Sequence, residues 1–442
     1  MQRTVATDHC RVVEPRAAGV SGPSASYVRS KGFVVVLFVL LLSGMAWALF
    51  ALTDLARQAQ SQTEIQHVAD HTAHALAVLA ARDLNFKAIT NRAMLANEVA
   101  IGQLHALLSW FEMAREMSLR TALYSAWIPY VNQVTAALAR MMQRIQPGLT
   151  QGTRALVRFQ QFVLDGLQHA QWTFHQATWL TSLSTAQVIA NESHLEAELF
   201  LLNHQTLIDL HYLWFRFQSR VSDDQAAAGY AHMAALSRDG FTKERTYRWF
   251  DAGFIYAQKA GGTKPVLRDR QMQWQSVDTV SFHERGLLFS WEHRFGAGGS
   301  FLSHRPPITG RPAGFGASYQ RNPRASRAAA RRAVPLGASH RIPHYYQIEQ
   351  TDNPSPSITV VVRVPQSNLA SERVPIWAAA RSEVFYERPS SLWPRVDGNR
   401  ERANLWNGLW QARSSTLSPF ERRLLGLQVH RGLHSTSGGF RA

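Results

Sequence analysis

The stretch FVVVLFVLLLSGMAWALFAL, residues 33–52, decides how this chain is organised. It holds no charged side chain over 20 positions, which is about the number of residues that a helix needs to cross roughly 30 Å of hydrocarbon. Arg29 and Lys31 precede it, and Asp54 follows it. Because positive charge favours the cytoplasmic side, the sequence predicts a single-pass helix in an inner membrane. The segment 1–32 is then cytoplasmic, and the main domain is periplasmic or otherwise extracytoplasmic.

A cleaved signal peptide is the alternative interpretation of this apolar run. The run is longer than the roughly 7 to 15 residues of a signal-peptide core, and its end at Ala51–Asp54 carries no small-x-small cleavage site. Cys10, the single cysteine, lies before the run, which excludes a lipoprotein anchor and any disulfide inside the main domain. We therefore expect an uncleaved anchor.

The distribution of proline divides the rest of the chain. Only four of the 18 prolines lie in the first 264 positions, so the runs 24–128 and 148–264 are free of proline. Since proline breaks helix interiors, both runs can form long helices, whereas the remainder cannot. The expected regions are a helical exported region at 53–260, a strand- and loop-rich region at 261–414 and a C-terminal tail at 415–442.

One face of the first long helix is apolar. Residues recur there at steps of three or four and fall within about 80° of one another on the helix. They are Phe86, Thr90, Ala93, Asn97, Ile101, Leu104, Leu108 and Phe111. Such a stripe must pack on something, and its small residues allow a partner helix to approach closely. Asn97 is a candidate for fixing the register of that packing.

Strand patterns begin after Gly261. Polar and apolar residues alternate over 274–280, and 358–364 is rich in β-branched residues. The segments 345–348 and 383–386 are further short strand candidates. The predicted fold class is therefore α+β, with a single N-terminal transmembrane helix, a long helical region and then a small, mainly antiparallel sheet with long loops.

The segment 305–341 concentrates positive charge. It carries eight arginines and no acid in a chain whose net charge is +16. Glycine and proline are scattered through it, which predicts a mobile basic insertion. It could hold phospholipid headgroups or another anionic surface, and a solvated insertion without that role is the equal alternative.

Four short segments carry a resemblance to a known family. They are ARDLNFKAITNRAMLAN at 81–97, RDGF at 238–241 with Arg245 after it, FYERP at 385–389, and ANLWN with WQAR at 403–413. Their order and their place after the anchor resemble the TadE/TadG-like proteins of Flp (tight adherence) pilus assembly.

Three features depart from the pattern of that family. Gly408-Leu409 stand where Pro-Tyr commonly precedes the tryptophan. Gly32-Phe33 resembles the processing site of related pseudopilins, but the fifth residue after the cut would be Leu37 instead of glutamate. No DxSxS string occurs in the sequence, so we expect no metal-dependent adhesion site.

Asn85, Asn91 and Arg92 are the candidate functional residues of the first motif. On a helix they lie outside the apolar stripe, where amides and a guanidinium can bond a packed neighbour with fixed geometry. They could dock a partner subunit, or they could fix the fold through the second half of the chain, for example at Glu387 or Glu401. We favour the second reading, because most side-chain hydrogen bonds serve the fold.

Other chemistries are less well supported. His67, His71 and His74 share a helix face near Asp70, but three imidazoles on one helix rarely complete a tetrahedral metal site. Aromatic and basic residues between 220 and 249 are more typical of a core flanked by solvated arginines than of a nucleic-acid groove. No catalytic or nucleotide-binding motif occurs in the sequence. We therefore expect no enzyme activity, no cofactor, no metal and no nucleic-acid partner.

The resemblance implies a membrane-anchored, non-catalytic structural component of Flp/Tad-type pilus assembly, either minor pilin-like or an assembly factor. Its partners would be pilus-assembly or pilin subunits, and a homo-oligomer could form through the apolar stripe. The alternative is a single-pass membrane sensor or ligand-binding protein with an exported helical domain. An exported hydrolase or metal enzyme is the third class.

Overall fold

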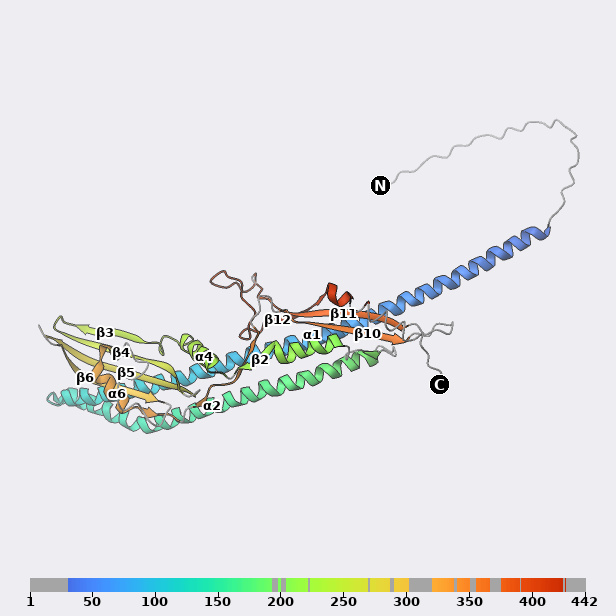
Figure 1. The fold of residues 1–442 in the computed structure, drawn as a ribbon. Coiled ribbons are helices and arrows are strands. Elements are labelled where there is room, and N and C mark those ends of the chain that lie inside the picture. The colour runs from blue at the N-terminus through green and yellow to red at the C-terminus, as the bar shows by residue number, and fades with distance from the viewer. Residues whose placement is uncertain are drawn as a thin grey trace, which may run out of the picture. The chain divides into compact units, whose positions relative to one another are not determined.

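The computed structural model describes most of the chain after residue 30. The described residues are 31–192, 198–199, 204–221, 223–268, 271–286, 290–301, 320–337, 340–349, 355–365, 375–389, 391–423 and 426. The chain divides into two compact units, residues 1–61 and 62–442. The fold class is α+β, with a long N-terminal helix and antiparallel or mixed sheets, as the sequence predicts (Figure 1).

Helix α1, Lys31–Tyr124, begins two residues before the apolar stretch and contains all of it. In the first unit its apolar side chains are exposed from Val34 to Leu52. Among the described residues, α1 is the one helix that is long and apolar enough to cross a membrane. Residues 1–30 of the predicted cytoplasmic segment 1–32, and residues 424–425 and 427–442 of the predicted tail 415–442, lie outside the described residues.

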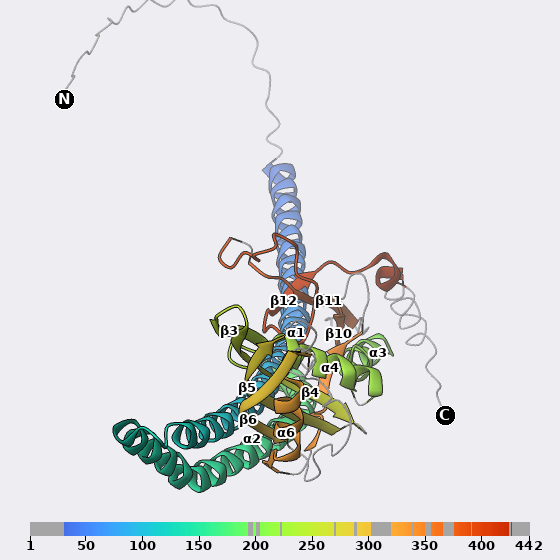
Figure 2. The same ribbon diagram turned by 90° about the vertical axis from the view of Figure 1, so that its left-hand side faces the viewer.

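In the second unit, α1 and α2 (Pro129–Glu192) form an antiparallel hairpin (Figures 1 and 2). Near the turn, the hydroxyls of Ser125 and Thr135 lie 2.7 Å apart. Further along, Gln146 donates to Glu112 at 2.9 Å. Pro147 lies inside α2, so the prediction that the stretch between the two proline-free runs cannot form a long helix is wrong. Packing of α2 against α1 on both sides of Pro147 compensates for the backbone hydrogen bond that proline removes.

The predicted helical region 53–260 is too long. After α2 come β1 (Glu198–Leu199), α3 (His204–His211), the π-helical turn η1 (Tyr212–Arg216), β2 (Gln218–Val221), α4 (Asp224–Leu236), β3 (Arg245–Asp251) and β4 (Ile255–Arg268). The last helix of this region, α4, therefore ends at Leu236. Strand β3 lies before the expected boundary at 261, and β4 crosses it. Absence of proline permits a helix but does not require one, and 245–251 is rich in residues that favour strands.

The remaining elements are mostly strands. They are β5 (Gln271–Arg285), β6 (Ser290–Phe301), α6 (Pro323–Arg331), β7 (Val334–Pro335), β8 (His340–Arg341), β9 (Tyr345–Ile348), β10 (Ser357–Pro365), β11 (Pro375–Tyr386) and β12 (Trp410–Ser415). All four predicted strand segments lie in strands, and the segment 345–348 coincides with β9. The chain forms more than the one small sheet that was expected, because strands pair in three separate sheets.

The three sheets are built almost entirely from antiparallel pairs. Their strand orders are β1-β10-β11-β12, β2-β9 and β3-β4-β5-β6-β7, with β8 paired to β5. Only the pair β6–β7 is parallel among the described strands. The first sheet packs its apolar face on α1 between Ile65 and Leu84, where Val360 and Val384 are fully buried.

Strand β6 lies between two helices, and its glycines make this possible. A Cβ atom on Gly298 would overlap the backbone of α1 at the Ser109 carbonyl, and one on Gly296 would lie 2.8 Å from the Met113 carbonyl. On the opposite face, a Cβ on Gly299 would lie 2.7 Å from the Ala329 carbonyl of α6. Alternate residues of a strand point to opposite faces. The close neighbour of this part of α1 is therefore a glycine-rich strand, whereas the sequence had suggested a helix.

Much of the predicted basic insertion is ordered structure. Helix α6 buries Ala325 and Ala329 against β5 and β6. Its first turn is held by Glu292, whose carboxylate accepts the backbone N–H groups of Arg324 at 2.6 Å and Ala325 at 2.9 Å. An alanine face alternating with arginines forms a stable helix once a sheet covers the alanines. The interpretation as a mobile loop is therefore wrong for 320–337, while 302–319 lies outside the described residues.

The deepest face of α1 is partly polar. Lys87, Asn91, Glu98 and His105 are fully buried there, together with Met94, Ile101 and Leu108. In contrast, Ala93 and Asn97 of the predicted stripe are only half-buried. The prediction that Asn91 lies outside the packed face is wrong, because its side chain is fully buried and donates to carbonyl groups of distant segments.

Candidate functional site

A charged cluster lies where α1, α2 and β2 meet. Lys87 and Asp83 are one helical turn apart on α1, and both are fully buried. The Nζ atom of Lys87 donates to Oδ2 of Asp83 and to Oε1 of Gln218, both at 2.6 Å, and it lies 2.7 Å from Nδ1 of His175. Of the three N–H donors of the ammonium group, Asp83 and Gln218 accept two. Nδ1 of His175 also lies 3.0 Å from Oδ2 of Asp83, and one ring nitrogen cannot both accept from Lys87 and donate to Asp83. The ring of Tyr346 covers the same nitrogen at 4.2 Å.

The electrostatics of this cluster follow from its burial. Loss of hydration lowers the pKa of Lys87 to about 8, although attraction to Asp83 acts in the opposite direction. Burial alone would raise the pKa of Asp83, but attraction to Lys87 and the hydrogen bond from His175 outweigh it and lower that pKa. Each charge is stabilised mainly by the other, so loss of either one leaves an uncompensated charge in the core.

A lysine with a lowered pKa can act as a nucleophile or a base. Lys87, however, is 0% exposed, and Asp83 and Gln218 accept two of its N–H groups. A substrate could reach its nitrogen only if the hairpin opened. The contacts of this cluster link α1, α2 and β2.

The next turns of α1 bond to the C-terminal segment. Asn85 donates to the carbonyl of Trp410 at 2.8 Å and accepts the Trp410 N–H at 2.9 Å. Asn91 donates to the carbonyls of Tyr346 and Leu405, both at 2.9 Å. Arg92 lies at the surface and donates to Oδ1 of Asn407 at 3.1 Å. All of these contacts lie within the chain.

The acceptors differ from those that the sequence suggested. Arg92 reaches Asn407 and not Glu387 or Glu401, although Asn407 in turn donates to Glu401 at 2.5 Å. Asn97 donates within its own helix, to the carbonyl of Ala93 at 2.7 Å. That bond does not link α1 to a neighbour, so it lends no support to a register-fixing role for Asn97.

The carboxylate of Glu401 accepts hydrogen bonds from several polar groups of the C-terminal motifs. It accepts from Tyr386 at 2.5 Å, from Asn404 at 2.9 Å and from Arg388. Burial would raise the pKa of Glu401, but these hydrogen bonds and that from Asn407 lower it to about 2. Residues of the FYERP and ANLWN segments therefore form one cluster around a single carboxylate.

A second buried ion pair lies under the large sheet. Lys259 of β4 donates to Asp278 of β5, and Arg245 of β3 reaches the same carboxylate at 3.1 Å. Ser109 of α1 donates to the other oxygen of Asp278 at 2.7 Å. Burial lowers the pKa of Lys259 even though Asp278 opposes the shift. This pair fixes the sheet to the far part of α1, as the first cluster does for β2.

The RDGF motif also makes intramolecular contacts. Arg238 donates to the carbonyl of Thr263, and Asp239 accepts from Gln103 of α1 at 2.9 Å. Asp239 also accepts the backbone N–H of Thr242 at 2.7 Å, which closes the turn before β3.

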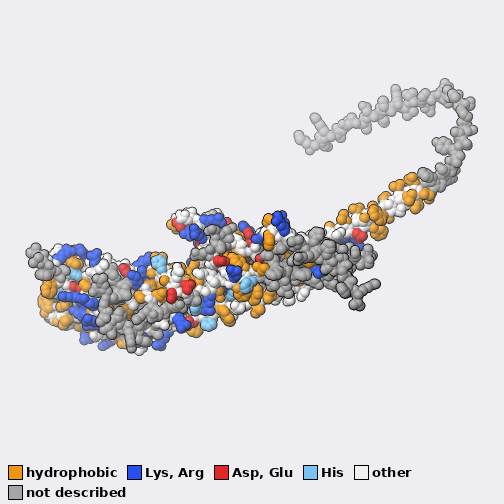
Figure 3. Space-filling model, in the orientation of Figure 1, with side chains coloured by type: hydrophobic (Ala, Val, Ile, Leu, Met, Phe, Trp, Pro, Cys, Tyr) orange, Lys and Arg blue, Asp and Glu red, His pale blue; other side chains and the backbone are white. Residues whose placement is uncertain are grey.

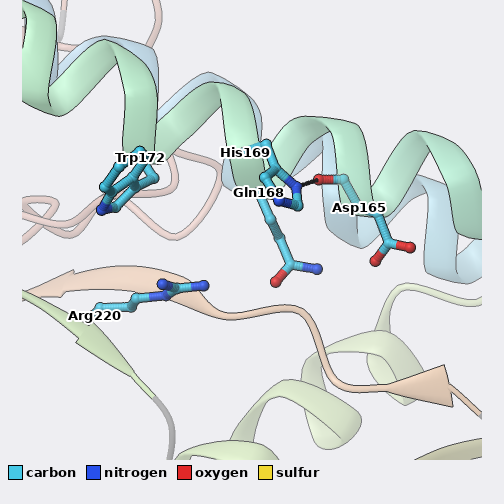
Figure 4. A pocket seen from close by; sticks show the side chains of 5 residues that line it. All are labelled: Asp165, Gln168, His169, Trp172 and Arg220. Carbon is cyan, nitrogen blue, oxygen red and sulfur yellow. Dashed lines mark hydrogen bonds between the residues drawn. The ribbon is translucent and has the colours of Figure 1, made fainter.

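One cavity of about 280 Å³ lies between α2 and β2 (Figure 4). Asp165, Gln168, His169 and Trp172 of α2 line it, and Arg220 of β2 faces them. The His169 ring bonds its own helix at the Asp165 carbonyl, 2.8 Å away. Gln168 accepts the His344 N–H at 3.0 Å. A guanidinium beside an indole is suited to a small planar anion.

The histidines of the first helix are not gathered into a metal site. His67, His71 and His74 are exposed, and the rings of the first two lie 6.1 Å apart. Among the described residues, no group of three or more His, Cys, Asp or Glu side chains is placed to hold a metal ion. His211 packs against Phe215, with ring centroids 5.2 Å apart. The side chains of His194 and His204 lie outside the described ones.

Sequence reasoning missed both buried lysines and the cavity. The spacing of Asp83 and Lys87 is a visible signal of an ion pair on one helix face. Nothing in the local sequence marks His175 or Gln218 as their neighbours. The same holds for Trp172 and Arg220, which are brought together only by the packing of β2 on α2.

Comparison with protein-family models, with curated proteins and with solved structures finds no match for this chain.

Proposed function

We propose that this protein is a membrane-anchored structural component of Flp/Tad-type pilus assembly, either a minor pilin-like subunit or an assembly factor, without a catalytic role. One observation carries the proposal. Three of the four segments on which the family resemblance rests, 81–97, 385–389 and 403–413, are far apart in the sequence, yet they are joined by hydrogen bonds in the fold. Asn85 and Trp410, for example, are 325 positions apart and share two hydrogen bonds.

This convergence supports the resemblance in a specific way. If these three motifs were chance matches, hydrogen bonds between their polar residues would not be expected. Instead, the first motif bonds the last at Asn85, Asn91 and Arg92, and Glu401 gathers residues around the third and the last. These hydrogen bonds stabilise the fold, and a structural protein depends on a stable fold.

The proposed location is the inner membrane, with the N-terminus in the cytoplasm and the second unit in the periplasm. The charge-free start of α1 and its exposed apolar side chains support an anchor. The basic residues before the helix support the orientation. The proposed partners are pilus-assembly or pilin subunits, and a second copy of the chain is a further one.

Pilus number in a deletion strain tests this function. Loss of the gene should reduce the number of Flp-type pili, and the wild-type gene should restore it. A gene that lacks residues 33–52 should not restore it, because the anchor places the second unit at the assembly site. An unchanged pilus number in the deletion strain would count against the proposal.

A single-pass sensor or ligand-binding protein is the second candidate. The cavity beside Trp172 and Arg220 favours it. A thermal-shift screen of small carboxylates, compared between the wild-type chain and Arg220→Gln, distinguishes the two candidates. A stabilising ligand that depends on Arg220 favours the sensor, and the absence of any such ligand favours the structural role.

A further inference from the structure

The turn of the α1–α2 hairpin exposes an unusual set of aromatic residues. Trp127 is 80% exposed and Tyr130 is 84% exposed, with Leu123, Tyr124 and Val134 exposed beside them. We call these five residues the hairpin tip. Scattered apolar side chains are normal on a protein surface, but a contiguous group usually marks an interaction site. An indole and a phenol also share a property, since each has an apolar body and a polar end.

The apolar surface continues along α2. Val134, Leu138, Met141 and Ile145 are exposed, and they recur at steps of four, three and four. Residues at this spacing lie on one face of a helix. The hairpin therefore presents an apolar stripe that begins at the tip and runs along its outer side.

Charge distinguishes this surface from an ordinary helix interface. From residue 117 to residue 164 the chain has five arginines and no acidic residue. Arg140, Arg144 and Arg158 are exposed on α2. Figure 3 shows hydrophobic and basic side chains side by side at this end of the hairpin. A helix face of this composition is typical of segments that lie in the interface of an anionic membrane.

Several backbone N–H groups at the turn are hydrogen-bonded within the chain. The N–H of Ser125 donates to Thr121 at 3.0 Å, that of Ile128 to Ser125 at 2.9 Å, and that of Asn132 to Ile128 at 2.8 Å. Polar backbone groups that enter a bilayer without partners are costly. Internal pairing of these groups lowers that cost for the tip.

We infer that the hairpin tip and the basic face of α2 bind the surface of a membrane that contains anionic phospholipids. Trp127 and Tyr130 enter the boundary between headgroups and acyl chains, and the exposed arginines contact lipid phosphates. A second copy of the hairpin fits less well, because it would bring two faces of the same charge together. The inference does not depend on the proposed function, since it concerns surface chemistry alone.

Vesicle binding by the full chain tests the inference. The chain is held in nanodiscs of neutral phosphatidylcholine, so that its long apolar helix is already embedded. The nanodiscs are then mixed with vesicles of phosphatidylcholine alone or with added phosphatidylglycerol, and co-sedimentation is measured. We expect binding to the anionic vesicles and little binding to the neutral ones, with a decrease as salt is raised.

Two variants separate the apolar and the charged contributions. Trp127→Ser with Tyr130→Ser should weaken binding by about tenfold or more, because two rings lose their burial. Replacing Arg140, Arg144 and Arg158 by glutamine should remove the preference for phosphatidylglycerol. The control is Leu392→Ser with Trp393→Ser, which alters two other exposed apolar residues, 70% and 60% exposed, and should leave binding unchanged.

The outcomes are decisive because all the substituted residues are at the surface. Equal melting temperatures for the variants and the wild type show that the fold is intact. Absence of wild-type binding, equal binding to both lipids or full binding by the tip variant overturns the inference. An acidic protein surface would then be the better occupant. No pilus is measured, so the result stands apart from the test of the proposed function.

Discussion

The side chain of Asn85 bonds both backbone groups of Trp410. It donates to the carbonyl at 2.8 Å and accepts the N–H at 2.9 Å, so it takes the place that a neighbouring strand would occupy at the start of β12. An amide is the side chain suited to this, because it offers one donor and one acceptor side by side.

Asn85→Ala should therefore lower the free energy of unfolding by about 2 kcal/mol, since two backbone groups of Trp410 lose their partners. Urea denaturation of the detergent-solubilised chain, followed by tryptophan fluorescence, measures the change. Asn85→Asp keeps the acceptor but places a carboxylate oxygen against the Trp410 carbonyl, so it should be at least as unstable as the alanine variant. Equal stability of all three chains would contradict the role assigned to this side chain.

Lys87→Met should destabilise the second unit strongly, by about 3 to 5 kcal/mol, because Asp83 would remain buried without its counter-ion. The double variant Lys87→Met, Asp83→Asn should cost less than the sum of the two single changes, since neither charge is then left alone. The matched control is Lys264→Met. Lys264 is paired with Glu244 at 3.6 Å at the surface, and its loss should cost about 1 kcal/mol or less. Additive effects at Lys87 and Asp83 would argue against the coupling.

Gly298→Ala should lower stability by about 1 to 3 kcal/mol, because the added methyl group overlaps the α1 backbone at Ser109. Gly229→Ala is the control. Gly229 lies in α4, and nothing is within 4 Å of a methyl group added there. Alanine at this position should stabilise the helix by up to about 1 kcal/mol. Thermal melting of the two variants should therefore shift in opposite directions.

Acid should weaken the C-terminal cluster through Glu401. Its pKa falls from 4.5 to about 2 in the folded chain. A lowered carboxyl pKa contributes stability that is fully present above the unfolded value and is lost as the pH falls through the folded one. The contribution should therefore disappear between about pH 4.5 and pH 2.

Glu401→Gln tests this by removing the titration. Its melting temperature should lie below that of the wild type at neutral pH, and the difference should shrink as the pH falls through that window. A difference that stays constant over the whole range would mean that Glu401 does not titrate as described. Other carboxyl groups also titrate there, so the comparison between the two chains is the relevant quantity.

The proposed topology can be tested with one cysteine at a time. Cys10 is the single cysteine of the chain, and Ser391 is an exposed position of the second unit. A membrane-impermeant maleimide added to intact spheroplasts should label Ser391→Cys in a Cys10→Ser background. It should not label the wild-type chain until the membrane is permeabilised. The reverse pattern would overturn the proposed orientation.

The sequence alone determined the features that depend on local composition. The charge-free run places a long apolar helix near the N-terminus, and alternation or β-branched content marks β5, β9, β10 and β11. The predicted boundary between helix and strand at 261 was misplaced, because a stretch without proline can form either a helix or a strand. The arginines of 320–337 suggested a loop. A helix forms there because β5 and β6 cover the alanine face of α6, and the local sequence does not reveal that contact.

Only the tertiary structure decided what the polar residues of α1 do. Lys87 lies on the buried face because His175 and Gln218, 88 and 131 positions away, lie next to its ammonium group. A helical period cannot distinguish a polar residue in water from one that is fully paired in a core. The partners come from distant segments that are brought together only when the whole chain folds, and the energy that favours burial exists only once they are in place.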